Sequence, residues 1–308
     1  MRLSLFDLHC DTAHRMLSEN QPLRSNSFAV SLENAEKFEV YTQIMALWPH
    51  NCLCDEEAQR QVFSMLENLK NDPSVLQEEA RITKRFDELT SIPNLFLSIE
   101  DARILAGNVD GVDRLYSLGV RFLTPLWKGH TCIGGAHDTE EGLTPFGKAA
   151  LHRAAELGMI LDISHASERS ANEIFAIGAA HSRPVIASHS NAFEVCPVSR
   201  NLKLEQIAAI VSCGGLIGLN LHAPFIGCGA HVKIQDLLPH IEYFLEVGAQ
   251  NALALGCDMD GGDLPSDLPD LAALPKLAEL LLQHGYSEGL VRKIFFENAS
   301  EFAKKYLN

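Results

Sequence analysis

The stretch MILDISHAS, residues 159–167, decides the fold of this chain. It begins with a short apolar run and ends in Ser164 and His165, and histidine is a common ligand of metal ions. A continuous apolar run of this length is typical of a strand that is buried on both faces of a parallel sheet. The next such run along the chain, PVIASH at residues 184–189, also ends in Ser-His. Two such strands in succession indicate a site at the edge where the strands end.

The same pattern occurs in three further apolar runs. They end at His9 and Asp11, at Glu100, and at Asp258 and Asp260. Five strand ends that all carry His, Asp or Glu side chains predict one cluster, gathered at the mouth of a parallel β-barrel. This is the geometry of a barrel enzyme that binds metal.

The whole chain contains eight apolar runs that predict strands. They cover residues 3–8, 40–47, 94–99, 119–124, 159–163, 184–188, 215–220 and 252–256. Eight units in 308 residues leave about 38 residues per unit, which suits a strand, a helix and an insertion. We therefore predict one α/β domain over residues 1–308, a (β/α)8 TIM barrel with inserted helices and a C-terminal helical extension. The alternative is an open doubly wound sheet, which does not naturally gather ligands from so many strands around one point.

Several helices have readable ends. Thr144 can cap a helix that starts at Pro145 and stops at Gly158. The long segment 49–93 predicts two helices, Glu56–Leu69 and Ser74–Leu89. Further expectations are a helix from Ser167 to Gly178, a helix over Leu204–Val211, a terminal helical hairpin from Ser287 through Leu307, and a long loop over the mouth at residues 257–270.

Composition excludes several classes of partner. The net charge of -15 argues against nucleic acid or an anionic membrane as a binding partner. No apolar stretch approaches the roughly 18 residues of a membrane-spanning helix, and the N-terminus reads as a first strand instead of a signal peptide. We therefore expect a cytoplasmic protein. Its eight cysteines match no zinc-finger spacing and are expected to be reduced thiols.

His9 and Asp11 form an H-x-D pair whose side chains point the same way on an extended strand. They can hold one divalent cation together, although such a pair also occurs as a helix cap or a loop contact. Glu100 has two carboxylate oxygens and can bridge two metals, although a glutamate is also common at a helix start. His165 and His189 can complete the set, although a single histidine after a strand is most often a hydrogen-bonding residue. These five ligands suit two zinc ions that share Glu100 and a water-derived hydroxide.

Two further positions suit the handling of a substrate. Either Asp258 or Asp260 can act as a proton shuttle or bind an ammonium group, although Asp-x-Asp-Gly-Gly is also typical of a tight turn. Arg200 can bind a carboxylate with two hydrogen bonds, although most arginines are simply solvated.

An ordered set of motifs resembles the membrane, or renal-type, dipeptidases, which are zinc metallopeptidases of the amidohydrolase-like barrels. The motifs are DLHCDT (7–12), SIE (98–100), GLTPFG (142–147), DISHAS (162–167), ASHSNA (187–192), SRN (199–201), GCDMDG (256–261) and the ending FFENA (295–299). The similarity covers essentially the whole chain.

This resemblance implies a residue-by-residue assignment. One zinc ion would be held by His9 and Asp11, the other by His165 and His189, and Glu100 would bridge them. Arg200 matches the arginine that contacts the C-terminal carboxylate of the dipeptide. Asp258 matches the aspartate near the free amine, which is also proposed as the proton shuttle. The family cleaves dipeptides, often accepts a D-residue on the C-terminal side, and commonly forms homodimers.

The chain also departs from the family pattern. Trp127 stands where animal members have a substrate-contacting histidine after the fourth strand, and His130 is a candidate to replace it. Asp101 follows Glu100 where the family usually has glycine, which is expected to place a second carboxylate near the site. The lipid-anchor signal and leader of the animal enzymes are missing, so no membrane association is expected.

The sequence supports a zinc-dependent dipeptidase. Its expected substrates are dipeptides, and L-Xaa-D-Xaa dipeptides are included among them. A lactonase or cyclic-amide hydrolase on the same scaffold is the alternative, but those barrels often bridge their metals with a carbamylated lysine, and no lysine ends a strand here. A metal-binding protein without catalysis is a third possibility. Side-chain preference would reside in the loops 49–56, 127–141 and 223–232.

Overall fold

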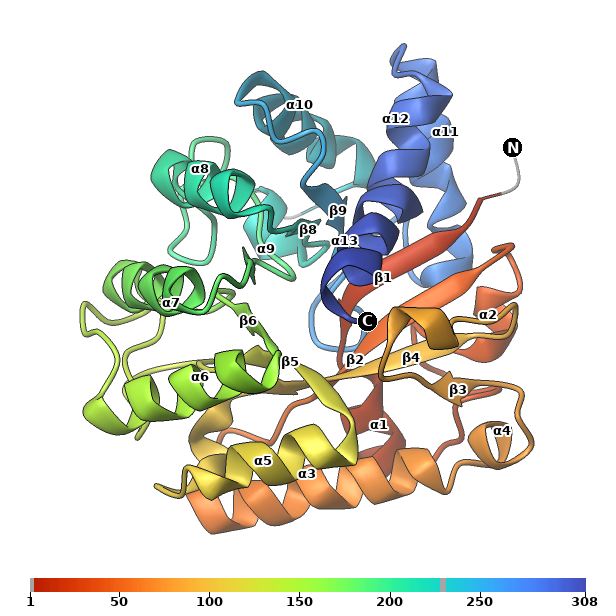
Figure 1. Ribbon diagram of the computed structural model, residues 1–308. Coiled ribbons are helices and arrows are strands. Elements are labelled where there is room, and N and C mark those ends of the chain that lie inside the picture. The colour runs from red at the N-terminus through yellow and green to blue at the C-terminus, as the bar shows by residue number, and fades with distance from the viewer. Residues whose placement is uncertain (1–2, 228–230) are drawn as a thin grey trace.

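Eight parallel strands form the barrel at the centre of the computed structural model, which describes residues 3–227 and 231–308 (Figure 1). They are β1 (Leu5–Cys10), β2 (Tyr41–Leu47), β4 (Asn94–Glu100), β5 (Val120–Thr124), β6 (Ile160–Asp162), β7 (Val185–Ile186), β8 (Ile217–Leu219) and β9 (Leu253–Leu255). Their order is β7-β6-β5-β4-β2-β1-β9-β8, and a parallel bridge between Ala187 and Ile217 joins β7 to β8. The predicted (β/α)8 barrel is confirmed, and each strand lies within two residues of its predicted bounds.

Helices surround this barrel in Figure 1. The longer ones are α1 (Thr12–Glu19), α3 (Asp55–Lys70), α5 (Asp110–Leu118), α6 (Pro145–Leu157), α7 (Glu168–Ala180), α8 (Leu204–Cys213), α10 (Leu238–Glu246), α11 (Pro275–Gln283) and α13 (Asn298–Tyr306). Shorter turns are α2 (Leu32–Ala35), α4 (Pro73–Leu76), η1 (Phe86–Glu88), η2 (Ala102–Leu105), α9 (Ala223–Ile226), η3 (Ile234–Leu237), η4 (Leu271–Ala273), α12 (Glu288–Arg292) and η5 (Lys293–Glu297). As predicted, Thr144 caps α6 by accepting a hydrogen bond from the Gly147 amide, and Gly158 ends it in the left-handed region.

Two helix predictions are wrong. The helix expected over Ser74–Leu89 ends after one turn, because Glu78 has a φ of +59° and β3 (Arg81–Ile82) then pairs with the start of β4. The terminal hairpin is instead one continuous helical run through α12, η5 and α13. No glycine or proline interrupts residues 290–307, and η5 is a π-helical segment, a form that occurs mostly as a single wide turn inside an α-helix.

The end of the barrel opposite the site is filled by an apolar cluster. It contains residues from seven strands, Leu216 just before β8, and side chains of α13. Its main members are Phe6, Ile44, Phe96, Phe122, Ile160, Ile186, Leu216, Ala254 and Phe302. Residues from seven of the barrel strands can meet in one cluster only inside the barrel, so these side chains form its core. Figure 1 shows α13 lying across this end of the barrel, which closes it.

A bulge in β1 turns a functional side chain toward the barrel axis. Asp7 pairs with Gln43 and Cys10 with Met45, so β1 has one extra residue between these pairs. Leu8 belongs to the interior cluster, and His9, the next residue, also faces the interior residues Glu100 and His189. Bulges commonly redirect side chains next to active sites in this way.

Two glycines let a neighbouring backbone come close. A Cβ atom at Gly218 or Gly256 would lie 1.8 or 1.7 Å from the Ser188 carbonyl oxygen. No other residue type fits there without moving the backbone. β8 and β9 therefore pack directly against the end of β7, from which Ser188 and His189 extend into the site.

Three further sequence expectations concern membrane-spanning helices, the cysteines and the loop after β9. Within the described ranges, no helix has both the length and the apolar character needed to cross a bilayer. The seven cysteines in these ranges carry free thiols, and the eighth, Cys228, lies outside the described residues. The predicted loop over the mouth, residues 257–270, contains no helix or strand.

Candidate metal centre and active cavity

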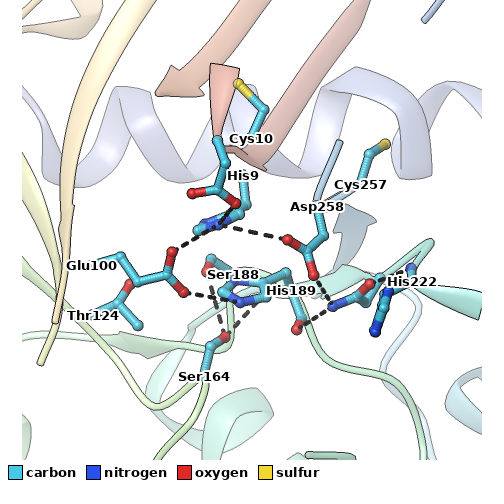
Figure 2. Close-up of polar contacts among 12 residues, drawn as sticks. His9, Cys10, Glu100, Thr124, Ser164, Ser188, His189, His222, Cys257 and Asp258 are labelled. Carbon is cyan, nitrogen blue, oxygen red and sulfur yellow. Dashed lines mark hydrogen bonds and ion pairs between the residues drawn. The ribbon is translucent and has the colours of Figure 1, made fainter. Parts of the chain in front are cut away.

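The five predicted ligands meet at the carboxyl end of the barrel. Figure 2 shows three of them, His9, Glu100 and His189. His9 is the last residue but one of β1, Glu100 is the last residue of β4, and Asp11 follows β1 directly. His165 and His189 follow β6 and β7. Because parallel strands all end at the same edge of the barrel, side chains far apart in sequence converge here.

The ligand atoms are close enough to share metal ions. His9 Nε2 lies 3.4 Å from Asp11 Oδ2 and 3.3 Å from Glu100 Oε2. The other oxygen of the same carboxylate, Glu100 Oε1, lies 2.9 Å from His165 Nε2 and 3.6 Å from His189 Nε2. Three groups of three candidate ligands result, His9–Asp11–Glu100, Glu100–His165–His189 and His9–His189–Asp258, and Glu100 belongs to the first two. This is the arrangement that a bridging carboxylate between two cations requires.

Several of these atoms are buried without a hydrogen bond. Among the described residues, no hydrogen-bond partner of suitable geometry exists for either ring nitrogen of His9 or for Asp11 Oδ1. Buried polar atoms without partners are rare because each costs about 1–3 kcal/mol. His165 Nε2 and His189 Nε2 also point at each other, 2.9 Å apart. Imidazole nitrogens and carboxylate oxygens are ligands of zinc, so bound cations would satisfy these atoms.

The opposite nitrogens of two histidines are held by the protein. His165 Nδ1 lies 3.0 Å from the Trp127 carbonyl oxygen, which can only accept a hydrogen bond. His189 Nδ1 lies 2.7 Å from Ser188 Oγ, which itself donates to Asp162 Oδ2. With the proton on Nδ1, each Nε2 keeps its lone pair for the centre, as metal-binding histidines normally require.

Asp162 is a supporting residue that the sequence reasoning missed. Its buried carboxylate also accepts hydrogen bonds from Thr124 Oγ1 at 2.7 Å and from the amides of Ser164 and Ser188 at 2.8 and 3.0 Å. It thus fixes the ends of β5, β6 and β7 relative to one another. A charged residue inside the apolar run ILDIS was the signal that could have revealed it.

The backbone is strained where it supplies these side chains. Positive φ angles occur at Asp101 (+74°), His165 (+68°), Asp258 (+56°) and Asp260 (+69°), each just after a barrel strand. Non-glycine residues rarely adopt this conformation, and such strain is concentrated at functional sites. At Asp101, for example, glycine would adopt this backbone conformation more easily than aspartate does. The expected second carboxylate does not join the cluster, because Asp101 Oδ2 instead lies 2.7 Å from Arg103 Nε.

The two aspartates after β9 have different surroundings. Asp258 Oδ1 lies 4.0 Å from His9 Nε2, and its Oδ2 accepts a hydrogen bond of 2.9 Å from Asn220. Asp260 instead turns away from the cluster and accepts hydrogen bonds from Thr12 Oγ1 at 2.6 Å and the Ala29 amide at 2.7 Å. Asp258 therefore faces the centre, and Asp260 holds the loop in place.

The protonation of the cluster suits a cation. Burial raises the pKa of Glu100 to about 7 and also raises the pKa of Asp11. Burial opposes a charge on His9, but Glu100 and Asp11 outweigh it and raise the pKa of His9 well above its usual value. Burial lowers the pKa values of His165 and His189, which stay neutral. Burial thus disfavours the ionised form of both carboxylates, and a bound divalent cation would favour it.

Arg200 is a buried cation beside the cluster. Its Nη1 donates to Ser190 Oγ at 3.3 Å and its Nη2 to the His189 carbonyl at 3.2 Å. Its Nε has no hydrogen-bond partner, and no carboxylate of the described residues lies within ion-pair distance of it. Burial lowers the pKa of Arg200 from its usual value. A buried guanidinium without a counterion is a ready site for an anion.

A cavity of about 330 Å³ opens over the centre. Trp48 and Trp127, whose ring centroids are 5.1 Å apart, form one wall, and Arg200, Phe225 and Asp258 are on its other sides. The predicted loops 127–141 and 223–232 each contribute lining residues, although residues 228–230 of the latter lie outside the described ranges.

The imidazole expected from His130 is not in this cavity. His130 is half exposed, pairs with Glu141 at 2.7 Å, and lines a separate depression behind Trp127. His137 lies in the cavity instead, with its amide bonded to the His165 carbonyl and its Nδ1 2.8 Å from Ser199 Oγ. Burial, with Arg200 second, lowers the pKa of His137 to about 4, so the ring is neutral. His137 was not predicted as a site residue from the sequence, although it lies in the predicted loop 127–141.

Comparison with known proteins finds a matching family and a relative of similar sequence. The model of the membrane dipeptidase family, peptidase family M19, matches residues 1–305. The uncharacterized protein in the pqqA 5'region of Klebsiella pneumoniae is 33% identical over 210 residues, which cover 63% of this chain and 76% of that protein.

Two solved structures have the same fold. Dipeptidase AC, a metallo peptidase of family M19, superposes with a TM-score of 0.90 at 24% identity and covers 100% of this chain and 99% of its own. A metallo peptidase from Rhodobacter sphaeroides, liganded with a phosphinate mimic of the dipeptide L-Ala-D-Ala, gives a TM-score of 0.89 at 23% identity, with coverages of 99% and 100%.

Proposed function

Because the chain belongs to the membrane dipeptidase family, peptidase family M19, we propose that this metallo-dipeptidase uses two zinc ions to hydrolyse dipeptides. The observation that carries the proposal is the position of Glu100, whose two carboxylate oxygens face different sets of ligands. A single carboxylate shared in this way is suited to two ions. The Rhodobacter structure with its mimic of L-Ala-D-Ala supports the choice of a dipeptide, including one with a D-residue.

The residues fit the metals that the family implies. His9 and Asp11 would hold one zinc ion, His165 and His189 the other, and Glu100 both. The unpartnered atoms of His9 and Asp11 support this assignment, as do the fixed Nδ1 positions of His165 and His189. When bound, the two ions supply an activated water and polarise the carbonyl of the scissile bond.

Two side chains would recognise the ends of the substrate. Arg200 would bind the C-terminal carboxylate through its unpartnered Nε–H and a remaining N–H of an Nη atom, because Ser190 and His189 each accept only one N–H from the two Nη atoms. Asp258 would bind the N-terminal ammonium, since its carboxylate faces the cavity and the cluster. A peptide whose two charged ends must reach both groups can contain only one peptide bond.

Asp258 would also handle the proton of the reaction. The water must lose a proton and the leaving amine must gain one, so a carboxylate near both can carry it between them. Asn220 fixes Asp258 by its hydrogen bond, and the strained φ of +56° aims the side chain at His9. Asp260 has no comparable position. Trp127 would contact the substrate as part of the aromatic wall, and the homodimer and the cytoplasmic location stay predictions from the sequence.

A substrate panel tests this proposal. The zinc-loaded protein should hydrolyse L-Ala-Gly and should act at least about 100-fold more slowly on L-Ala-Gly-Gly and N-acetyl-L-Ala-Gly, which fail to place a charged end on Asp258 or Arg200. The measurement is kcat/KM for each compound, with γ- and δ-lactones as the comparison set. Turnover of lactones without turnover of dipeptides would identify another amidohydrolase, and bound zinc without any turnover would identify a metal-binding protein.

A further inference from the structure

A second cavity, of about 580 Å³, adjoins the active cavity. We call it the side cavity. Its lining includes Ile163, Phe193, Ser199, Leu202 and Gln206. His137, His165 and Arg200 line both the side cavity and the active cavity. The outer rim of the side cavity is formed by the first turns of α7 and α8, which lie next to each other in Figure 1. The two cavities therefore meet beside the candidate metal centre.

The position of Arg200 decides what can reach the side cavity. Its two Nη atoms are fixed by Ser190 and His189, so the guanidinium cannot swing away from the shared wall. A dipeptide carboxylate on Arg200 would place the C-terminal α-carbon at this wall. The side chain of that residue begins at the next atom, so it starts where the two cavities meet. The residue on the amino side of the scissile bond lies farther from Arg200.

The lining of the side cavity suits a neutral side chain. Ile163, Phe193 and Leu202 are apolar, while Ser199 and Gln206 offer neutral hydrogen-bonding groups. The other charged residues of the lining balance in number, since Glu140 and Glu168 are matched by Arg169 and Lys203. Lys203 Nζ bonds to Glu168 and lies 5.4 Å from the Phe193 ring centroid. A carboxylate or ammonium group would lose its water there without meeting a net opposite charge.

We infer that the side cavity receives the side chain of the C-terminal residue of the substrate and selects neutral side chains. This inference rests on the proposed function, which places the dipeptide carboxylate on Arg200. It also predicts stereoselectivity. From a carboxylate held in one place, the L and D epimers direct their side chains differently, so only one epimer enters the side cavity.

A filled side cavity tests the inference. Phe193→Trp narrows the side cavity without touching a residue of the proposed site, and Phe193→Leu keeps it open. Phe175→Trp, on α7 but in neither cavity wall, is the matched control. The measurement is kcat and KM of each zinc-loaded variant on L-Ala-Gly, L-Leu-Gly, L-Ala-L-Leu and L-Ala-D-Leu. Phe193→Trp should lower kcat/KM at least about tenfold for one Ala-Leu epimer, mainly through KM, and change both glycine dipeptides by less than about twofold.

The outcomes separate this inference from the proposed function. A loss confined to L-Leu-Gly, an equal loss on all four substrates, or no change on either Ala-Leu epimer would overturn the side cavity as the C-terminal subsite. The wild-type protein should also prefer Ala-Gln to Ala-Glu in the favoured epimer, and the reverse preference would overturn its neutral selectivity. If the wild-type protein leaves L-Ala-Gly intact, the proposed function itself is overturned.

Discussion

Replacing Glu100 by glutamine should lower kcat for dipeptide hydrolysis at least about 1,000-fold, which corresponds to about 4 kcal/mol of transition-state stabilisation. Glutamine has the same shape, but its amide carries no charge and offers only one oxygen. It can therefore no longer place one carboxylate oxygen beside His9–Asp11 and an equivalent one beside His165–His189. The variant should also bind less zinc. Steady-state kinetics and metal analysis of the same sample check both expectations.

The stability of the metal-free protein provides the control. Burial raises the pKa of Glu100 to about 7, so its ionised form is disfavoured in the folded, metal-free state. This destabilising contribution is absent at low pH and grows as pH rises from the unfolded pKa of about 4.3 through the folded value. Metal-free Glu100→Gln should therefore unfold at the same or a higher temperature than the metal-free wild type at pH 8. A large drop in that temperature would mean that the lost activity reflects misfolding.

Replacing Arg200 by methionine should lower kcat/KM for dipeptides by about 100- to 1,000-fold, mainly by raising KM. A hydrogen bond to a charged group contributes about 1.5–3 kcal/mol, and a buried carboxylate left without its partner costs more. Methionine keeps an unbranched apolar chain up to about the position of Nε, and it removes the guanidinium group, whose central carbon lies 5.3 Å from the Phe225 ring centroid. Arg200→Lys, which keeps a charge but not the planar geometry, should be intermediate.

A dipeptide amide separates recognition from structure. The wild-type protein should hydrolyse L-Ala-Gly amide poorly, because the amide offers Arg200 no negative charge. The Arg200→Met substitution should then lower kcat/KM for the amide little further, since the amide makes no ionic interaction with Arg200 that the substitution could remove. Equal losses on the free acid and the amide would show that Arg200 supports the fold of the site instead of binding the carboxylate.

The barrel could be read from the sequence because parallel strands buried on both faces are continuous apolar runs. The carboxyl ends of these strands also lie at one edge of the barrel. The ligands could therefore be assigned to one cluster before any interatomic distance was known. The helix over Ser74–Leu89 could not be judged correctly, because the short strand Arg81–Ile82 depends on pairing with β4, which is a tertiary contact.

Other features of the site depend on how strands pair and how loops fold, and a local sequence pattern does not contain this information. Asp162 and Ser188 are 26 residues apart, and their contact exists only because β6 and β7 pair in one register. His130 and His137 lie in the same loop, and only the folded path of that loop brings His137 rather than His130 beside His165. The different roles of Asp258 and Asp260 likewise arise from the partners that the loop after β9 meets.

The most direct test of the two-metal centre is to titrate the metal-free protein with zinc and follow L-Ala-Gly hydrolysis. The account predicts no measurable hydrolysis without metal, full activity near two zinc ions per chain, and two bound ions by elemental analysis of that sample. Full activity in the metal-free protein, or saturation at one ion with Glu100 contributing to a single site, would contradict it.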